Sequence, residues 1–141
     1  MGEYRLNNLD QSKSRILGYI KLNGPSITMK LSNYLKLDSL LTSAFLSELL
    51  GEQQIKMSNM KVGNSPVYYI PGQENQLDKF ANFLGSKQKE SFNLLKERKV
   101  LKDEDQLPAT RVALRSIKDF AFPIEHNEIL FWRHFSINDS E

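Results

Sequence analysis

The stretch KVGNSPVYYIPGQE, residues 61–74, decides how the chain is divided. Its Gly-Asn-Ser link at 63–65 tolerates a tight reversal, positive φ included, and separates two runs that suit β-strands, residues 54–62 and 65–70. A phosphate-binding loop would need a second glycine and a lysine between a strand and a helix, whereas here a strand follows. The stretch therefore predicts the tip of a hairpin, and the Pro-Gly pair at 71–72 closes the first unit.

Upstream of this hairpin, apolar residues recur at helical spacing in three segments, 10–22, 29–35 and 39–50. Helix-capping residues stand near each start, and a short strand over 26–28 fits between the first two helices. The capping residues are Asp10 or Ser12, Thr28 and Asp38. Within the first strand of the hairpin the apolar alternation changes phase, which predicts a bulge near Ser58-Asn59.

Downstream, the same order of elements returns. A connecting helix over 73–85 is followed by a helix from 87 after a Ser86 cap, a strand at 99–101, a turn at 103–107, a helix over 108–120 and a hairpin over 122–135. This order, twice in succession, resembles the winged helix-turn-helix superfamily in its archaeal and bacterial members. The resemblance implies an α+β fold, mostly helical, with two winged helix-turn-helix units in tandem, 1–72 and 86–137, joined by a helix over 73–85.

Composition narrows the functional classes. The 141 residues include 40% hydrophobic and 26% charged residues, which is typical of a folded, soluble protein. The absence of cysteine excludes disulfides, thiolate catalysis and cysteine zinc sites. No signal-peptide core and no bilayer-length apolar run are found, so we expect an intracellular, cytoplasmic protein without membrane contact, associated with the nucleoid if it binds DNA.

Positive charge is concentrated in the second half. Residues 79–118 hold 10 Lys/Arg against 5 Asp/Glu, a net charge of +5, while residues 119–141 have a net charge of −4. Thr110, Arg111, Arg115 and Lys118 share the polar face of the helix expected over 108–120. Arginines there are suited to reading guanine or gripping phosphate. The alternative is a solvated helix face on which Arg115 pairs with Asp119.

The wider candidate DNA-binding set adds residues that flank this helix or belong to the first unit. In the first unit the helix in the recognition position, 39–50, offers hydroxyls but neither lysine nor arginine. The added candidates are Lys87, Lys89, Lys99, Lys102, Ser39, Thr42, Ser43, Lys61 and Asn64.

Other chemistry is poorly supported by the sequence. His126, His134 and Glu128 lack the short spacings typical of zinc sites, and the acidic run 103–105 lacks the glycine and final glutamate of a calcium loop. We interpret that run as a solvated turn. With no nucleophile–base set, we predict neither enzymatic activity nor a metal or cofactor.

Two functions follow from the winged-helix resemblance. The first is a protein that binds double-stranded DNA, as a transcription regulator or chromosome-associated factor. The second is a protein–protein interaction module or scaffold subunit built from tandem winged helices, with a protein partner or a homodimer. The neutral helix 39–50 and the acidic second hairpin, 125–128, favour the second.

Overall fold

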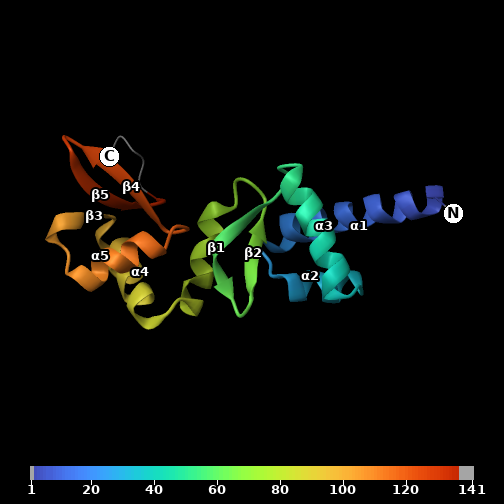
Figure 1. Cartoon of the computed structure of the whole chain (residues 1–141), viewed down its shortest axis with the longest axis horizontal. Helices are drawn as coiled ribbons and strands as arrows, with labels where there is room; N and C mark the ends of the chain where they lie inside the picture. Colours follow the sequence, from blue (N-terminus) through green and yellow to red (C-terminus); the bar gives the residue numbers. More distant parts are fainter. Residues whose placement is uncertain (1, 137–141) are drawn as a thin grey trace. The chain divides into compact units, whose positions relative to one another are not determined.

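The computed structural model describes residues 2–136, with side chains described from residue 11 onward. The predicted ends of the two domains at residues 1 and 137, and the side chain of the predicted cap Asp10, lie outside this part. The fold is α+β, with helices and two small antiparallel sheets (Figure 1). Contacts between Cα atoms divide the chain into two compact units, Met1–Gln76 and Leu77–Glu141.

The first unit contains three helices followed by a hairpin. The elements are α1 (Gly2–Asn23), α2 (Thr28–Leu35), α3 (Ser39–Gly51), β1 (Lys56–Val62) and β2 (Ser65–Tyr69). The predicted start of the first helix was wrong, because α1 begins at Gly2. The cap at Asp38 is confirmed, since its carboxylate accepts a hydrogen bond from the Leu41 amide. Thr28 is instead the first residue of α2, and its N–H donates to the Ser65 hydroxyl.

The hairpin of the first unit has the predicted irregularity. The register of β1 against β2 shifts between Met57 and Lys61, and the buried Ser58 hydroxyl serves the bulge. It donates to the Met60 carbonyl at 2.7 Å and accepts from the Val67 amide at 2.8 Å. This satisfies two buried backbone groups that the broken ladder would leave unpaired.

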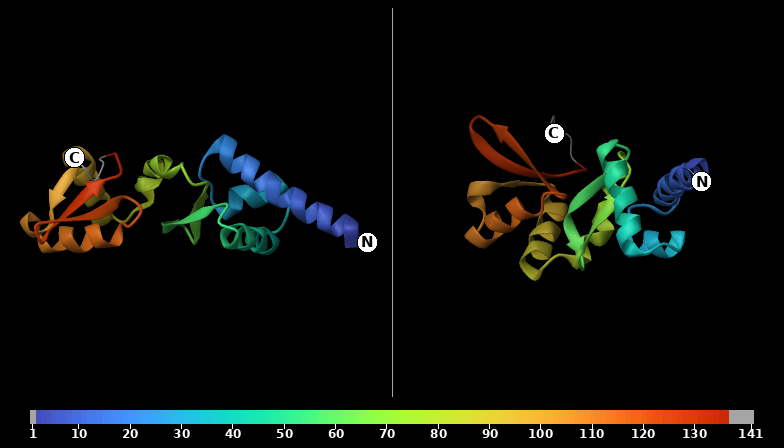
Figure 2. Two further views of the ribbon diagram at one scale, coloured as in Figure 1. Left: turned by 90° about the horizontal axis from the view of Figure 1, so that it is seen from above. Right: turned by 45° about the vertical axis from the view of Figure 1, so that its right-hand side comes forward.

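A third strand position completes this small sheet. Ser26 forms an isolated bridge with Tyr68, with backbone hydrogen bonds of 2.9 and 2.8 Å in the two directions. The hairpin lies beside the three helices in both views of this unit (Figure 2). The core between them contains residues of all three helices, β2 and the residue before β1: Ile16, Ile20, Leu31, Leu35, Phe45, Leu46, Leu49, Ile55 and Tyr68. Tyr69 is buried too, at 8% exposure.

The second unit has a three-stranded sheet. Its elements are η1 (Glu74–Phe83), which begins just before the unit border, α4 (Ser86–Arg98), β3 (Val100–Lys102), η2 (Asp103–Asp105), α5 (Pro108–Ser116), β4 (Ala121–His126) and β5 (Ile129–His134). The strand order is β3-β5-β4, and both pairings are antiparallel. Phe92 of α4 contacts Phe120 edge to face, with ring centroids 4.9 Å apart, in the core of this unit.

One helix expected in this half is present and another is shorter than expected. The connecting helix expected over 73–85 is the 3₁₀-helix η1, with Leu77 and Ala81 buried. Spacings of three and four residues between apolar side chains suit both helix types, so the pattern cannot separate them. The helix expected over 108–120 ends at Ser116, because Ile117 leaves helical geometry at φ −93° and ψ 63°.

Candidate nucleic-acid interface

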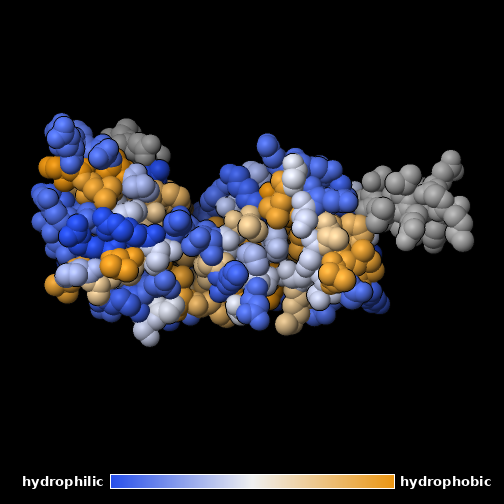
Figure 3. All heavy atoms as spheres, in the orientation of Figure 1, coloured by the Kyte–Doolittle hydropathy of each residue, from blue (hydrophilic) through white to orange (hydrophobic). Residues whose placement is uncertain are grey.

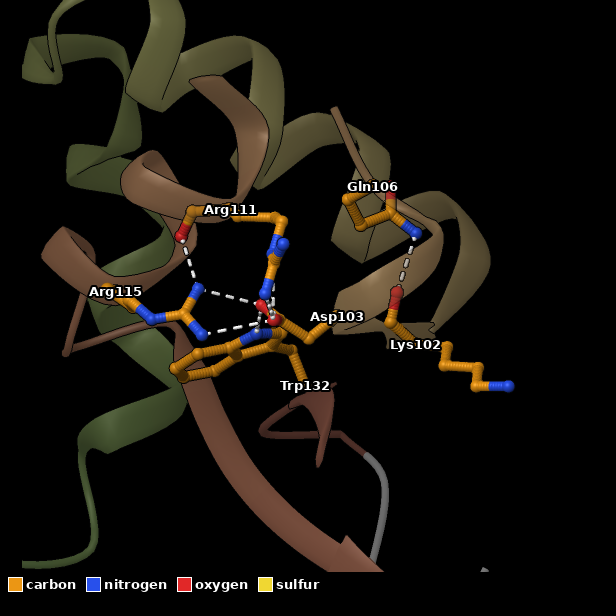
Figure 4. Close-up of polar contacts among 6 residues, drawn as sticks. All are labelled: Lys102, Asp103, Gln106, Arg111, Arg115 and Trp132. Carbon is orange, nitrogen blue, oxygen red and sulfur yellow. Dashed lines mark hydrogen bonds and ion pairs between the residues drawn. The ribbon is translucent and has the colours of Figure 1, made fainter. Parts of the chain in front are cut away.

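One cluster of polar side chains in the second unit joins three elements that lie apart in the sequence. Asp103 is the first residue of η2, immediately after β3. Arg111 and Arg115 are one turn apart on α5, and Trp132 lies on β5, paired in register with Leu101 of β3. The short β3–η2 connection and the pairing of β3 with β5 therefore bring the acid and the indole together beneath one face of α5 (Figure 4).

Asp103 accepts hydrogen bonds from all three partners. Arg115 Nη1 and Nη2 lie 2.7 and 3.0 Å from its two carboxylate oxygens. Arg111 Nε and Nη2 both reach Oδ2, at 2.9 and 2.8 Å. Trp132 Nε1 donates to Oδ1 at 2.9 Å, and the Arg115 guanidinium lies 5.6 Å from the centroid of the indole ring. The carboxylate is thus saturated with donors, two of them cationic side chains.

The cluster combines a buried carboxylate with two partly exposed guanidiniums, and all three groups are charged. Asp103 is only 4% exposed, whereas the side chains of Arg111 and Arg115 are 44% and 45% exposed. The hydrogen bond from Arg115 is the main cause that holds the pKa of Asp103 well below its usual range, against the opposing effect of burial. The same hydrogen bond raises the pKa of Arg115. One buried negative charge therefore holds two half-exposed positive charges at the surface, and the net charge of the three side chains is +1.

The structure corrects several expectations about this helix. Thr110 is buried, at 6% exposure, so its placement on the exposed polar face was wrong. Lys118 is exposed but lies beyond the end of α5, so it does not continue the helical row of Arg111 and Arg115. The guanidinium of Arg115 bonds to Asp103, where the sequence had offered Asp119 as its partner.

The remaining basic candidates of the second unit differ in exposure and in their ion pairs. Lys99 is exposed and Lys89 is half-buried. Lys87 pairs with Glu90 at 3.6 Å, and Lys102 pairs with Glu104 at 2.9 Å. Hydrophilic side chains cover much of the face of this unit seen in Figure 3, with separate hydrophobic spots between them.

In the first unit the candidates on α3 form no comparable cluster. Thr42 is fully buried and donates its hydroxyl to the Asp38 carbonyl, so the expectation of an exposed Thr42 was wrong. Ser43 is half-buried and Ser39 is exposed. The exposed positions of α3 are mixed: Leu40 and Leu41 near its start are 82% and 41% exposed, and Glu48 near its end is exposed too. Lys61 and Asn64 are exposed at the β1–β2 hairpin.

Sequence reasoning missed both Asp103 and Trp132. The acidic run was expected to be a solvated turn, which holds for the exposed Glu104 and Asp105 but is wrong for the buried Asp103. A usable signal was present, because a lone tryptophan in a strand needs a partner for its N–H when buried. Its partner nevertheless lies 29 residues away, so only the fold identifies it.

A second polar cluster involves His134, which had been weighed as a metal ligand. Its Nε2 lies 3.1 Å from Asp78 Oδ2, and its Nδ1 lies 2.9 Å from the Ser136 hydroxyl. Burial lowers the pKa of His134, although Asp78 acts in the opposite direction. His126, the last residue of β4, and Glu128, in the turn before β5, are exposed at the opposite end of β5 from His134. Among the described residues, no group of three or more histidine and acidic side chains is placed to hold a metal ion.

Comparison with models of protein families, with curated proteins and with solved structures finds no match to this chain. In the described part of the chain, no helix combines the length and apolar character needed to cross a bilayer.

Proposed function

We propose that the chain is a tandem winged-helix protein that binds double-stranded DNA through its second unit, as a transcription regulator or chromosome-associated factor. The first support is the shared strand order of the two units. In each, a short strand position after the first helix pairs with the last strand of the hairpin: Ser26 with β2, and β3 with β5. A wing hairpin that pairs with a short strand position between the helices agrees with the arrangement expected of a winged helix-turn-helix unit.

The observation that carries the proposal is the presentation of Arg111 and Arg115 on α5. This is the helix that precedes the hairpin, in the position of a recognition helix. Both guanidiniums are about half exposed and both are fixed by Asp103. Fixed, exposed arginines on a helix of this position are suited to contacts with the negative charge of DNA.

The test is a titration of a labelled DNA duplex, followed by fluorescence anisotropy, at several salt concentrations. Binding through phosphates should weaken steeply between about 50 and 200 mM salt, because each neutralised phosphate releases counterions. Lys118→Gln should weaken binding, whereas Lys30→Gln on α2 is the matched control of equal charge change. If no duplex binds at low salt, the proposal fails.

A protein-interaction role is the second candidate, and α3 favours it. This helix has no basic residue, and Leu40 at its start is 82% exposed. A helix surface without basic residues is unsuited to phosphates, and exposed leucines such as Leu40 are suited to protein contacts. Sedimentation over a range of concentrations tests self-association, and Leu40→Glu should abolish any dimer that uses this face. A chain that stays monomeric at all concentrations excludes the homodimer.

A further inference from the structure

The inference concerns which part of DNA the second unit contacts, and it rests on the proposed DNA binding. A guanidinium is planar and carries five N–H donors, arranged so that two edges each present a pair of donors. One edge is formed by Nε and one Nη nitrogen, and the other by both Nη nitrogens. Asp103 occupies different edges on its two arginines (Figure 4).

On Arg111 the edge in use is Nε with Nη2, both directed at Asp103 Oδ2. On Arg115 it is Nη1 with Nη2, and the second hydrogen on Nη1 goes to the Arg111 carbonyl at 2.9 Å. Within the described part of the chain, Asp103 and this carbonyl are the acceptors bonded to the two guanidiniums. Each arginine therefore keeps one complete two-donor edge, Nη1/Nη2 on Arg111 and Nε/Nη2 on Arg115.

A free two-donor edge fits two oxygens of one phosphate group or the acceptor pair of guanine. The way in which Asp103 holds Arg111 and Arg115 favours phosphate over guanine. Both guanidiniums are folded back to within 3.0 Å of a carboxylate that is 4% exposed, and Arg115 also lies over the Trp132 ring. The major groove is about 8.5 Å deep, so a base edge requires a side chain extended away from its own domain. Phosphates lie at the outer rim and need no such extension.

We infer that Arg111 and Arg115 form a paired site for phosphodiester groups of the DNA backbone, with Asp103 as the residue that positions both. The two arginines set the orientation of the protein on DNA and contribute to its affinity for DNA, and they do not read base sequence. Holding the guanidiniums in place before binding reduces the side-chain entropy lost in the complex, which favours a tight grip on a flexible backbone. The net charge of +1 in the cluster keeps the site attractive to anions.

Two properties of the chain make this testable. Trp132 is the single tryptophan, and it touches both Asp103 and Arg115, so its emission reports on the site. Replacing one arginine by glutamine leaves Asp103 paired with the other, which protects the fold. Arg111→Gln and Arg115→Gln are the main variants, Arg111→Lys keeps the charge but removes the two-donor edge, and Lys30→Gln on α2 is the control.

The experiment measures the affinity of each variant for two duplexes, one containing only A·T pairs and one rich in G·C pairs, at several salt concentrations. We expect each glutamine variant to lose about tenfold in affinity on both duplexes, with a salt slope smaller by about one. We expect Arg111→Lys to lose affinity on both duplexes while retaining the slope. Binding of either duplex should change the Trp132 emission of the unmodified protein.

Three results would overturn the inference. A loss confined to the G·C-rich duplex would assign base reading to the arginines, while DNA binding itself would stand. Unchanged affinity in all arginine variants would place the DNA contact elsewhere. Absence of any duplex binding at low salt would remove the proposed function as well. In that case a Trp132 response to polyglutamate would identify a carboxylate-bearing protein ligand.

Discussion

Replacing Asp103 by asparagine tests the energetic role of the buried carboxylate. The substitution keeps the shape and one carbonyl acceptor but removes the charge that two guanidiniums share. Removing one partner of a buried ion pair costs about 3–5 kcal/mol, chiefly because a buried charge is left uncompensated. Here the buried charge is the one removed, and both arginines are about 45% exposed and regain water, so the cost of losing the ion pairs falls below that range. The buried Trp132 N–H also loses part of its acceptor, so we expect the second unit to lose about 2–3 kcal/mol.

The assay is urea unfolding followed by the emission of Trp132, which reports on the second unit alone because the chain has one tryptophan. Asp105→Asn is the matched control, since Asp105 lies two residues away and is exposed. That control should change the free energy of unfolding by no more than about 0.5 kcal/mol. If Asp103→Asn proved as mild as the control, the carboxylate would contribute no net stability and our account of the cluster would be wrong.

The pH dependence of the free energy of unfolding tests the role of Asp103 independently. The pKa of Asp103 is lowered in the folded state, so its contribution is complete above the unfolded-state pKa of about 3.9 and is lost as pH falls toward the folded value. The stability difference between the unmodified protein and Asp103→Asn should therefore be constant from about pH 7 to 5 and shrink below about pH 4. A difference that stays constant down to pH 3 would contradict the linkage.

Three further outcomes are expected. Ser58→Ala removes the acceptor of the buried Val67 amide and should cost the first unit about 1–3 kcal/mol by urea unfolding followed by circular dichroism; an unchanged midpoint would contradict the role given to the bulge. Glu128 has a φ of 67° in the β4–β5 turn, so Glu128→Gly should raise the free energy of unfolding of the second unit by about 0.5–1 kcal/mol, measured by tryptophan emission. A lower free energy of unfolding would show that the glutamate side chain stabilises the turn. Because burial lowers the pKa of His134 despite the opposing Asp78, the unfolded chain takes up the proton first and stability should fall as pH drops below about 6.5. In His134→Gln this fall should be smaller, and an equal fall would assign it to other groups.

Local signals predicted the first unit well because they act over a few residues. The cap at Asp38 determines where α3 starts, the phase change in the apolar alternation marks the bulge, and Gly63 takes its positive φ of 64° at the hairpin tip. The interior face of a helix is harder to predict from composition alone. On α3 the buried face contains Thr42 beside Phe45, because the hydroxyl finds a backbone acceptor within its own helix and can then be buried.

The same difficulty explains the errors on α5. Thr110 is buried beside Ala113 and Leu114, while Val112 is 69% exposed. Placing Thr110 on the exposed face therefore rotates the helix by up to about 100°, the angle between successive residues. The arginine face was still predicted correctly, because residues four apart share a side whatever the rotation. Its partner Asp103 could not be predicted, since the contact depends on how η2 lies under α5.

The helix that precedes each hairpin differs in charge between the two units. This difference indicates which unit is suited to DNA and which to a protein partner. The chain of α3 carries one glutamate and no basic residue, whereas α5 carries two arginines and no acid. The phosphates that border a DNA groove attract the arginines of α5. They form no favourable contact with the exposed Leu40 of α3. If the first unit approaches DNA at all, its hairpin residues Lys61 and Asn64 are better suited to the contact than α3. The exposed leucines at the start of α3 would then remain available to a protein, so the two proposed functions do not compete for one surface.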